Sequence, residues 1–122
     1  MDLRPTGRST DAPRLMVRGE IVRISAPQRA RGHEQRGARP GVVVQCDELL
    51  ALSTVLVAPT SRSAAAATFR PIIDVSGTQT RVLIDQLRAL DAQAIGGSLG
   101  RLSHDELQAL DDALVLVLGL RL

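Results

Sequence analysis

At 122 residues and a formal net charge of +2, the chain is long enough for one compact domain and too short for two of ordinary size. Its one cysteine, Cys46, excludes an internal disulfide framework, and its two histidines are not spaced as metal ligands, so we expect no metal and no cofactor. No stretch approaches the roughly twenty apolar residues of a membrane helix, and the N-terminus lacks an apolar signal segment; we therefore expect a cytoplasmic protein that does not enter a membrane.

The N-terminal third of the chain is strongly basic. Residues 1–39 hold nine arginines and four acidic residues, a net charge of +5, while the remainder has a net charge of −3; there is no lysine. Arginine suits phosphate because its planar guanidinium forms paired hydrogen bonds, so the pattern fits a surface that faces RNA or DNA. The alternative is an arginine-rich coding bias. Phe69 is the only aromatic residue, which excludes a platform of stacked bases.

Residues 1–16 are polar and aperiodic, which predicts a flexible tail before a domain at 17–122. The first predicted strand is Gly19–Ser25, with Val22 and Ile24 on one face and Ile21 on the other. The fourteen residues of Ala26–Arg39 contain no apolar run and predict a long, functional loop.

Several short strands are predicted after this loop. The expected strands are Gly41–Cys46, Thr54–Pro59, Thr68–Ser76 and Arg81–Leu90, with a turn or helical link at Asp47–Leu52, a turn at Gly77-Thr78 and a break at Gly96-Gly97. Pro71 cannot donate a backbone hydrogen bond, so we expect it at a sheet edge or a bulge.

The C-terminal segment predicts an amphipathic helix. Ser103 and Glu106 form a capping box, and apolar residues recur from Leu107 at a spacing of three and four. However, Ala113–Leu118 is apolar on all sides, which exceeds what one packed face can cover. We expect a second copy of the chain to cover it; the alternative is a deeper groove in the same chain. The whole pattern predicts a mainly β protein with a C-terminal helix, a small antiparallel barrel.

Several segments resemble the MazF/PemK family of toxins. Arg18-Gly19-Glu20-Ile21 is similar to the R-G-[DE]-hydrophobic opening of that family. The longer match is G-H-E-Q-x-G-x-R-P followed by a hydrophobic strand, from Gly32 to Val44, which carries the active site in the family. Ala58-Pro59-Thr60-Ser61 is similar to the segment that ends in a catalytic Thr or Ser. Asp85-Gln86 stands in a late strand where an acid–Gln pair is usual, and the S-x-x-E-L of the last helix also fits.

The resemblance covers roughly residues 17–120 and implies an SH3-like (CcdB/PemK) barrel that forms a homodimer. It implies the toxin of a type II toxin–antitoxin system, a metal-independent, sequence-selective endoribonuclease that cuts single-stranded RNA through attack of the 2′-hydroxyl and leaves 2′,3′-cyclic phosphate and 5′-hydroxyl ends. RNA would lie in a groove across the dimer, and a MazE-like antitoxin would place its acidic tail in the same groove. The residues to which it gives catalytic roles are Arg39, Thr60 and Glu34, and the candidate RNA-binding residues are His33, Gln35, Arg36, Arg31, Ser61 and Gln86.

Each role has a physical basis and a structural alternative. Arg39 suits the stabilisation of a charged phosphate transition state, and a plain surface charge is the alternative. Thr60 suits phosphate contact or proton relay, or it only caps a strand end. Glu34 is a base or it orients Arg39, and His33 is a proton shuttle or a solvated loop residue.

Two other functions remain open at this level. One is a toxin on the same fold that inhibits DNA gyrase without cutting RNA; the Gly32–Pro40 cluster argues against it, because such a protein has no need of a nuclease site. The other is an inactive relative that only binds an antitoxin, which the presence of Arg39 and Thr60 does not favour.

Overall fold

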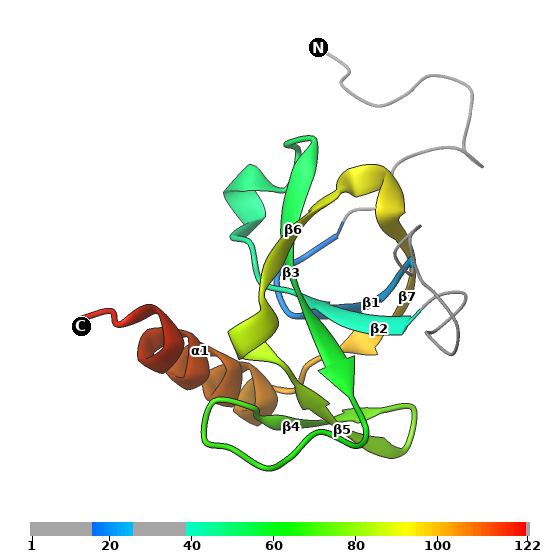
Figure 1. The fold of residues 1–122 in the computed structure, drawn as a ribbon. Coiled ribbons are helices and arrows are strands. Elements are labelled where there is room, and N and C mark those ends of the chain that lie inside the picture. The colour runs from blue at the N-terminus through cyan, green and yellow to red at the C-terminus, as the bar shows by residue number, and fades with distance from the viewer. Residues whose placement is uncertain (1–15, 26–38, 122) are drawn as a thin grey trace, which may run out of the picture.

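The computed structural model describes residues 16–25 and 39–121, in which one antiparallel sheet curls into a half-barrel with a single α-helix packed against it (Figure 1). In chain order the elements are β1 (Glu20–Ile24), β2 (Arg39–Val43), η2 (Asp47–Leu49), β3 (Thr54–Ser61), β4 (Ile72–Val75), β5 (Thr78–Val82), η3 (Ile84–Gln86), β6 (Arg88–Asp91), η4 (Ala92–Ala94), β7 (Ile95–Arg101) and α1 (His104–Leu118). The predicted class, mainly β with a C-terminal helix, is confirmed.

The sheet is organised around the long strand β3. Its strand order is β4-β5-β3-β2-β1-β7, and β6 also pairs with β3. The first half of β3 pairs with β6 from Thr54 to Val57, and its end pairs with β5 at Thr60 and Ser61. One strand therefore has two successive neighbours along the same side.

This arrangement explains why one predicted strand is wrong. The segment Arg81–Leu90 is not one extended strand, because η3 interrupts it between β5 and β6. After Leu83, whose N–H donates to the Pro59 carbonyl, the register with β3 shifts by three residues: Val82 is opposite Thr60, but Arg88 is opposite Val57. The surplus residues form η3. Asp85 and Gln86 therefore lie on the turn of η3 and not in a strand.

Other boundaries also differ from the predicted ones. The strand predicted at Thr68–Ser76 is only Ile72–Val75, although Pro71 does directly precede an edge strand, as expected. Gly96 and Gly97 do not interrupt the strand, contrary to the prediction. They belong to β7, at a point where its pairing with β1 shifts in register. The predicted helical link appears as η2.

Two apolar clusters occupy the two faces of the sheet. Ile21, Val42 and Ala58 pack under α1, while their neighbours Val22, Val43 and Val57 pack inside the curled sheet. Strands buried on both faces are expected to have continuous apolar runs, which explains the valine-rich sequence of β2 and β3. The predicted division of β1 into two faces is confirmed.

The helix begins and ends at clear caps. Ser103 Oγ accepts a hydrogen bond from Glu106 N (3.1 Å), and Glu106 Oε1 accepts one from Ser103 N (2.8 Å), so the predicted capping box is confirmed. The second oxygen of Glu106 accepts from Asp74 N (2.8 Å), which holds the edge strand β4 to the helix. Gly119 ends α1 in the left-handed conformation, φ 66°.

The Arg18-Gly19-Glu20 opening has a structural explanation. The Arg18 guanidinium donates to the Val44 carbonyl (2.8 Å) and forms an ion pair with Asp111 of α1 (2.7 Å). Gly19 has φ +87° and lies so close to Leu107 that a Cβ would be 3.1 Å from its side chain. This motif therefore joins the start of the domain to its last helix.

The last helix has more apolar side chains than its packed face buries, as the sequence predicts. Leu110, Ala113 and Leu114 are buried, but Leu116 and Leu118 remain 56% and 52% exposed. Together with η2 and β3, the end of the helix lines a mostly apolar groove of about 540 Å³, here called the C-terminal groove. No helix in residues 16–25 or 39–121 has the length and apolar character needed to cross a bilayer.

Gly41 provides a test of this packing. A Cβ on Gly41 would lie 2.9 Å from Val57 Cγ1 and 3.0 Å from Ile24 Cδ1, both on buried side chains. We expect Gly41→Ala to lower the free energy of unfolding by about 1–3 kcal/mol, as overpacked cores do, in urea denaturation followed by circular dichroism. Gly97→Ala is the matched control, since nothing lies within 4 Å of its Cβ position; equal stability of the two variants would contradict the packing described.

Candidate functional site

The end of β3 and the start of β2 bring Arg39 and Thr60 together. The antiparallel register pairs Gly41 with Pro59. Pro40, which precedes Gly41, therefore lies beside Thr60, which follows Pro59. Thr60 Oγ1 donates to the Pro40 carbonyl (2.8 Å), and Arg39 Nη2 donates to the Thr60 carbonyl across a long 3.5 Å. Two residues 21 positions apart in sequence are thus neighbours across one strand pair.

Both residues line a pocket of about 270 Å³, here called the Arg39 pocket. It is bounded by the ends of β2 and β3 and by the β4–β5 hairpin; its lining residues are Arg39, Pro40, Thr60, Ser61, Arg62, Val75, Thr78 and Thr80. Two of these side chains are guanidinium groups, and none is a carboxylate. Such a pocket is suited to an anion.

The two predicted residues differ in how freely they can act. Arg39 is half-buried and makes only the one long hydrogen bond with described residues, so most of its N–H donors remain available. Thr60 is 3% exposed, and its hydroxyl proton is engaged by the Pro40 carbonyl. The Thr60 hydroxyl oxygen can accept a further hydrogen bond, but the hydroxyl hydrogen is already bonded to the carbonyl of Pro40, which is on the strand that carries Arg39. Thr60 therefore has a structural role whatever else it does.

The structure brings together some of the predicted site residues and separates another. Ser61 lines the Arg39 pocket beside Thr60. Gln86 is exposed on η3 and does not line this pocket. The remaining predicted residues, Glu34, His33, Gln35, Arg36 and Arg31, lie outside the described residues, and their roles stay predictions.

Three polar lining residues were not singled out from the sequence: Arg62, Thr78 and Thr80. Thr78 and Thr80 alternate along β5 and so share a face of the hairpin. Arg62 directly follows the predicted segment that ends in Thr60-Ser61, so its position was a usable signal. The two threonines had none, because only the pairing of β5 with β3 carries them to the pocket.

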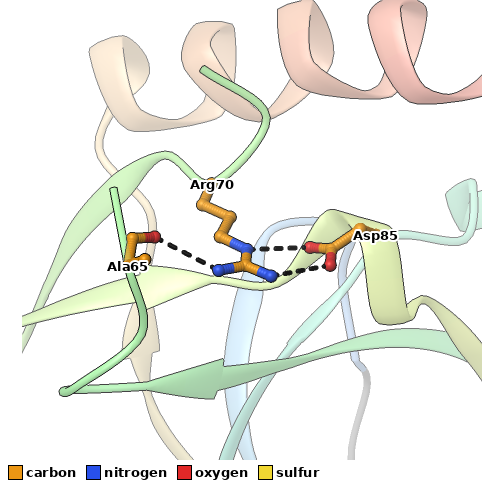
Figure 2. Close-up of polar contacts among 3 residues, drawn as sticks. All are labelled: Ala65, Arg70 and Asp85. Carbon is orange, nitrogen blue, oxygen red and sulfur yellow. Dashed lines mark hydrogen bonds and ion pairs between the residues drawn. The ribbon is translucent and has the colours of Figure 1, made fainter. Parts of the chain in front are cut away.

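The segment between β3 and β4 is anchored by one ion pair. Arg70 donates to both oxygens of Asp85, from Nε (3.1 Å) and from Nη2 (2.9 Å), and its third nitrogen donates to the Ala65 carbonyl (3.2 Å; Figure 2). The Arg70 carbonyl in turn accepts from Arg81 Nη1 (3.0 Å) on β5. Arg70 thus joins this segment to η3 through its guanidinium, and to β5 through its backbone carbonyl.

The ion pair also shifts the acidity of both groups. The hydrogen bonds from Arg70 lower the pKa of the Asp85 carboxyl, and the same bonds raise the pKa of the Arg70 guanidinium. Both side chains are partly exposed, so solvent screens their attraction. The pair therefore serves mainly to fix geometry: it sets the course of the chain that begins at Arg62.

Among the described residues, no group of three or more histidine, cysteine or acidic side chains is placed to hold a metal ion. The chemistry that the Arg39 pocket offers is anion binding by guanidinium groups, with hydroxyl oxygens beside them. A phosphodiester fits this set of groups.

The chain is similar to known toxins over most of its length. Residues 17–118 match the model of one protein family, described as PemK-like, MazF-like toxin of type II toxin–antitoxin system. A putative toxin of Mycobacterium tuberculosis is 38% identical over 107 residues, which cover 87% of this chain and all of that relative. Endoribonuclease MazF9 of the same organism is 33% identical over 117 residues, with 87% of this chain and 98% of that protein covered.

The fold is shared with solved structures. An endoribonuclease in complex with its cognate antitoxin, from a mycobacterial species, superposes with a TM-score of 0.73 at 18% identity, covering 88% of this chain and 98% of that one. At this identity the likeness concerns the fold, which is thus the half-barrel of this group of proteins.

The Arg70–Asp85 pair predicts a pH dependence of stability. Because the folded state lowers the pKa of Asp85, the pair stabilises the fold above the unfolded carboxyl value of about 3.9 and this contribution is lost as the pH falls through the folded value. We expect Asp85→Asn to lower Tm by a few degrees or less at pH 7, with the difference from wild type vanishing in acid.

Thermal denaturation between pH 3 and pH 7 measures this difference. Glu48→Gln serves as the control, because Glu48 is exposed and has no partner among the described residues. A gap between Asp85→Asn and wild type that stays constant down to pH 3 would refute the assignment.

Proposed function

The chain belongs to the PemK-like, MazF-like toxins of type II toxin–antitoxin systems, and on that premise we propose that it is an endoribonuclease that cleaves single-stranded RNA without a metal. The observation that carries the proposal is the Arg39 pocket, in which the Arg39 guanidinium has unused donors and the lining includes four hydroxyl-bearing residues and no carboxylate. The 33% identity to an endoribonuclease supports the same reaction class.

The reaction needs little from the protein, because RNA carries its own nucleophile. The 2′-oxygen attacks the adjacent phosphorus, the bond from phosphorus to the 5′-oxygen breaks, and the products are a 2′,3′-cyclic phosphate and a 5′-hydroxyl. One proton leaves the 2′-hydroxyl and one reaches the departing 5′-oxygen. The protein must move these protons and stabilise the extra negative charge on the phosphate.

Arg39 is proposed to stabilise that charge. Its position at the strand start and its unused N–H donors support a paired contact with the phosphate oxygens. A guanidinium remains protonated at any relevant pH, so it is a poor base. We propose that Glu34 takes the proton from the 2′-hydroxyl or orients Arg39, and that Thr60 and Ser61 accept or relay hydrogen bonds at the phosphate.

The partners follow from charge and apolar surface. We propose that a MazE-like antitoxin inhibits the protein by placing an acidic tail in the cationic Arg39 pocket; a solved relative of the same fold is complexed with its cognate antitoxin. We propose further that two copies of the chain form a homodimer through the C-terminal groove, where Leu118 and Leu120 are half exposed beside Leu49 and Leu56. RNA would cross the dimer, and the protein would act in the cytoplasm.

The activity can be tested on defined single-stranded RNA in EDTA. We expect wild type to cleave, and Arg39→Ala to lower kcat/KM by about 10²–10³-fold, the usual cost of removing a preorganised charge donor. Thr60→Ser should retain most activity, whereas Thr60→Val, which keeps the shape and removes the hydroxyl, should lose at least about tenfold. Arg101→Ala is the control, since Arg101 is exposed on β7 outside the pocket.

Gel analysis and the mass of the 3′ fragment ends identify the products. Cleavage that requires a divalent cation would contradict the proposal. So would cleavage that survives both Arg39→Ala and Thr60→Val in folded protein. Growth arrest with intact RNA and broken DNA would instead favour a gyrase inhibitor.

The proposed dimer has its own test. We expect Leu118→Glu to convert the protein from dimer to monomer mass in sedimentation analysis, because a charge in an apolar interface is left unpaired. Leu52→Glu is the matched control: Leu52 is as exposed as Leu118, at 52%, but does not line the C-terminal groove. A wild type that is monomeric at high concentration would rule the interface out.

A further inference from the structure

A second cationic pocket adjoins the Arg39 pocket. It has a volume of about 220 Å³, is here called the Arg81 pocket, and is lined by Arg62, Ile72, Gln79, Thr80 and Arg81. Arg62 and Thr80 line both pockets. The two hollows are therefore neighbours that share two side chains.

The strand register explains this arrangement. Side chains alternate along β5, so Thr78 and Thr80 face one way while Gln79 and Arg81 face the other. Pairing between β3 and β5 ends at Ser61 and Arg81; in the described structure, β5 before Arg81 has a strand neighbour only on the β4 side. The edge of β5 between the two pockets is thus not covered by a paired strand, and Arg62 lies where β3 has ended.

The charges of this region are unbalanced. Three arginines line the two pockets, and none of the lining residues is a carboxylate. Arg62 makes no hydrogen bond or ion pair with any residue in the described ranges. Arg81 is half-buried and donates one N–H to the Arg70 carbonyl (3.0 Å), which fixes its guanidinium while leaving other donors available. A held guanidinium loses less conformational entropy when it binds an anion.

Two neighbouring pockets with hydrogen-bond donors suit a polymer that carries a negative charge on every unit, such as a nucleic acid. The Arg81 pocket has one apolar lining residue, Ile72, so it offers little to the apolar anchors on which peptide binding usually depends. A nucleic acid backbone needs no such anchor, because phosphate contacts alone supply affinity and register.

We propose that the Arg81 pocket is a second phosphate subsite of the single-stranded RNA, and that it holds the phosphate next to the one being cleaved. Arg62, which lines both pockets, contacts both phosphates across the unpaired edge of β5. Arg81 and Gln79 bind the phosphate next to the scissile one. The Arg70–Asp85 pair acts on this subsite indirectly, because the Arg70 carbonyl positions Arg81. This inference rests on the proposed ribonuclease activity and adds to it the residues that set the path of the substrate.

The test separates binding from chemistry. The substrate is an RNA that wild type cleaves, and the binding probe is the same RNA with a 2′-O-methyl group at the cleavage position, which blocks attack and keeps every phosphate. We expect Arg81→Gln to raise KM and the probe's Kd about tenfold at low salt while kcat stays within about threefold, because a uniform contact is lost. Arg62→Gln should raise both constants to a similar extent and should also lower kcat, because Arg62 contacts the phosphate being cleaved. The slope of log K against log salt should fall by roughly 0.7 for each lost phosphate contact. Arg101→Gln, outside both pockets, should change none of these.

A neutral phosphate analogue locates the contact. Replacing the phosphate beside the scissile one with a methylphosphonate should weaken binding to wild type about as much as Arg81→Gln does, and should have little further effect on that variant. Melting temperatures establish that the variants fold; should Arg81→Gln unfold, Arg62→Gln decides, since Arg62 has no partner among the described residues.

The outcomes are distinguishable. Wild-type cleavage with unchanged Kd, KM and salt slope in Arg62→Gln and Arg81→Gln would overturn the subsite and leave the ribonuclease intact. Variants that bind the probe normally but lose affinity for an acidic peptide would assign the pocket to a protein partner and overturn the proposal. Absence of any RNA cleavage by wild type would instead refute the proposed function itself, and with it the subsite that depends on that function.

Discussion

The pairing of β2 with β3 is the constraint on which the rest of the structure depends. Gly41 pairs with Pro59, the side chains of Val57 and Ile24 leave no room for a Cβ at this position, and the Thr60 hydroxyl donates to the neighbouring Pro40 carbonyl. These contacts determine where the guanidinium of Arg39 lies. A slip of one residue would move every side chain of β2 to the opposite face of the sheet, so the apolar packing of β2 and the position of Arg39 are fixed by the same register.

The same strand β3 also determines how the pocket is closed. Because β5 takes only the last two residues of β3, the hairpin that it forms with β4 projects past the end of the strand. The threonines of β5 then complete the Arg39 pocket, and the opposite face of the hairpin forms the Arg81 pocket. The nearby carboxylates line neither pocket: Asp85 is held by Arg70, Glu106 caps the helix and the edge strand, and Asp74 pairs with Gln79 in the hairpin without lining either pocket. The charged residues that line the two pockets are therefore all arginines, although residues 40–122 have a net negative charge.

The helix reveals a second constraint, on the outer surface. Its buried side chains close the core under the sheet, but the apolar sequence continues past the last of them to Leu116 and Leu118. A protein of this size rarely leaves so many large apolar side chains in water without a partner. The side with the cationic pockets and the C-terminal groove have different chemistry, which suits them to different partners.

The sequence by itself determined the elements whose signals are local. Alternating and continuous apolar runs predicted β1, β2 and β3, the capping box predicted α1, and the Gly32–Pro40 motif with Ala58–Ser61 pointed to Arg39 and Thr60. Tertiary structure alone decided what depends on partners distant in sequence. The turn of η3 takes up the three-residue shift in register between the β3–β5 and β3–β6 pairings. Gly96 and Gly97 continue a strand because β7 pairs with β1 across a shift in register. Thr78, Thr80 and Arg81 reach the pockets only through the register of β5 with β3. Local propensity cannot show these features, because the free energy that favours them comes from contacts between segments far apart in the chain.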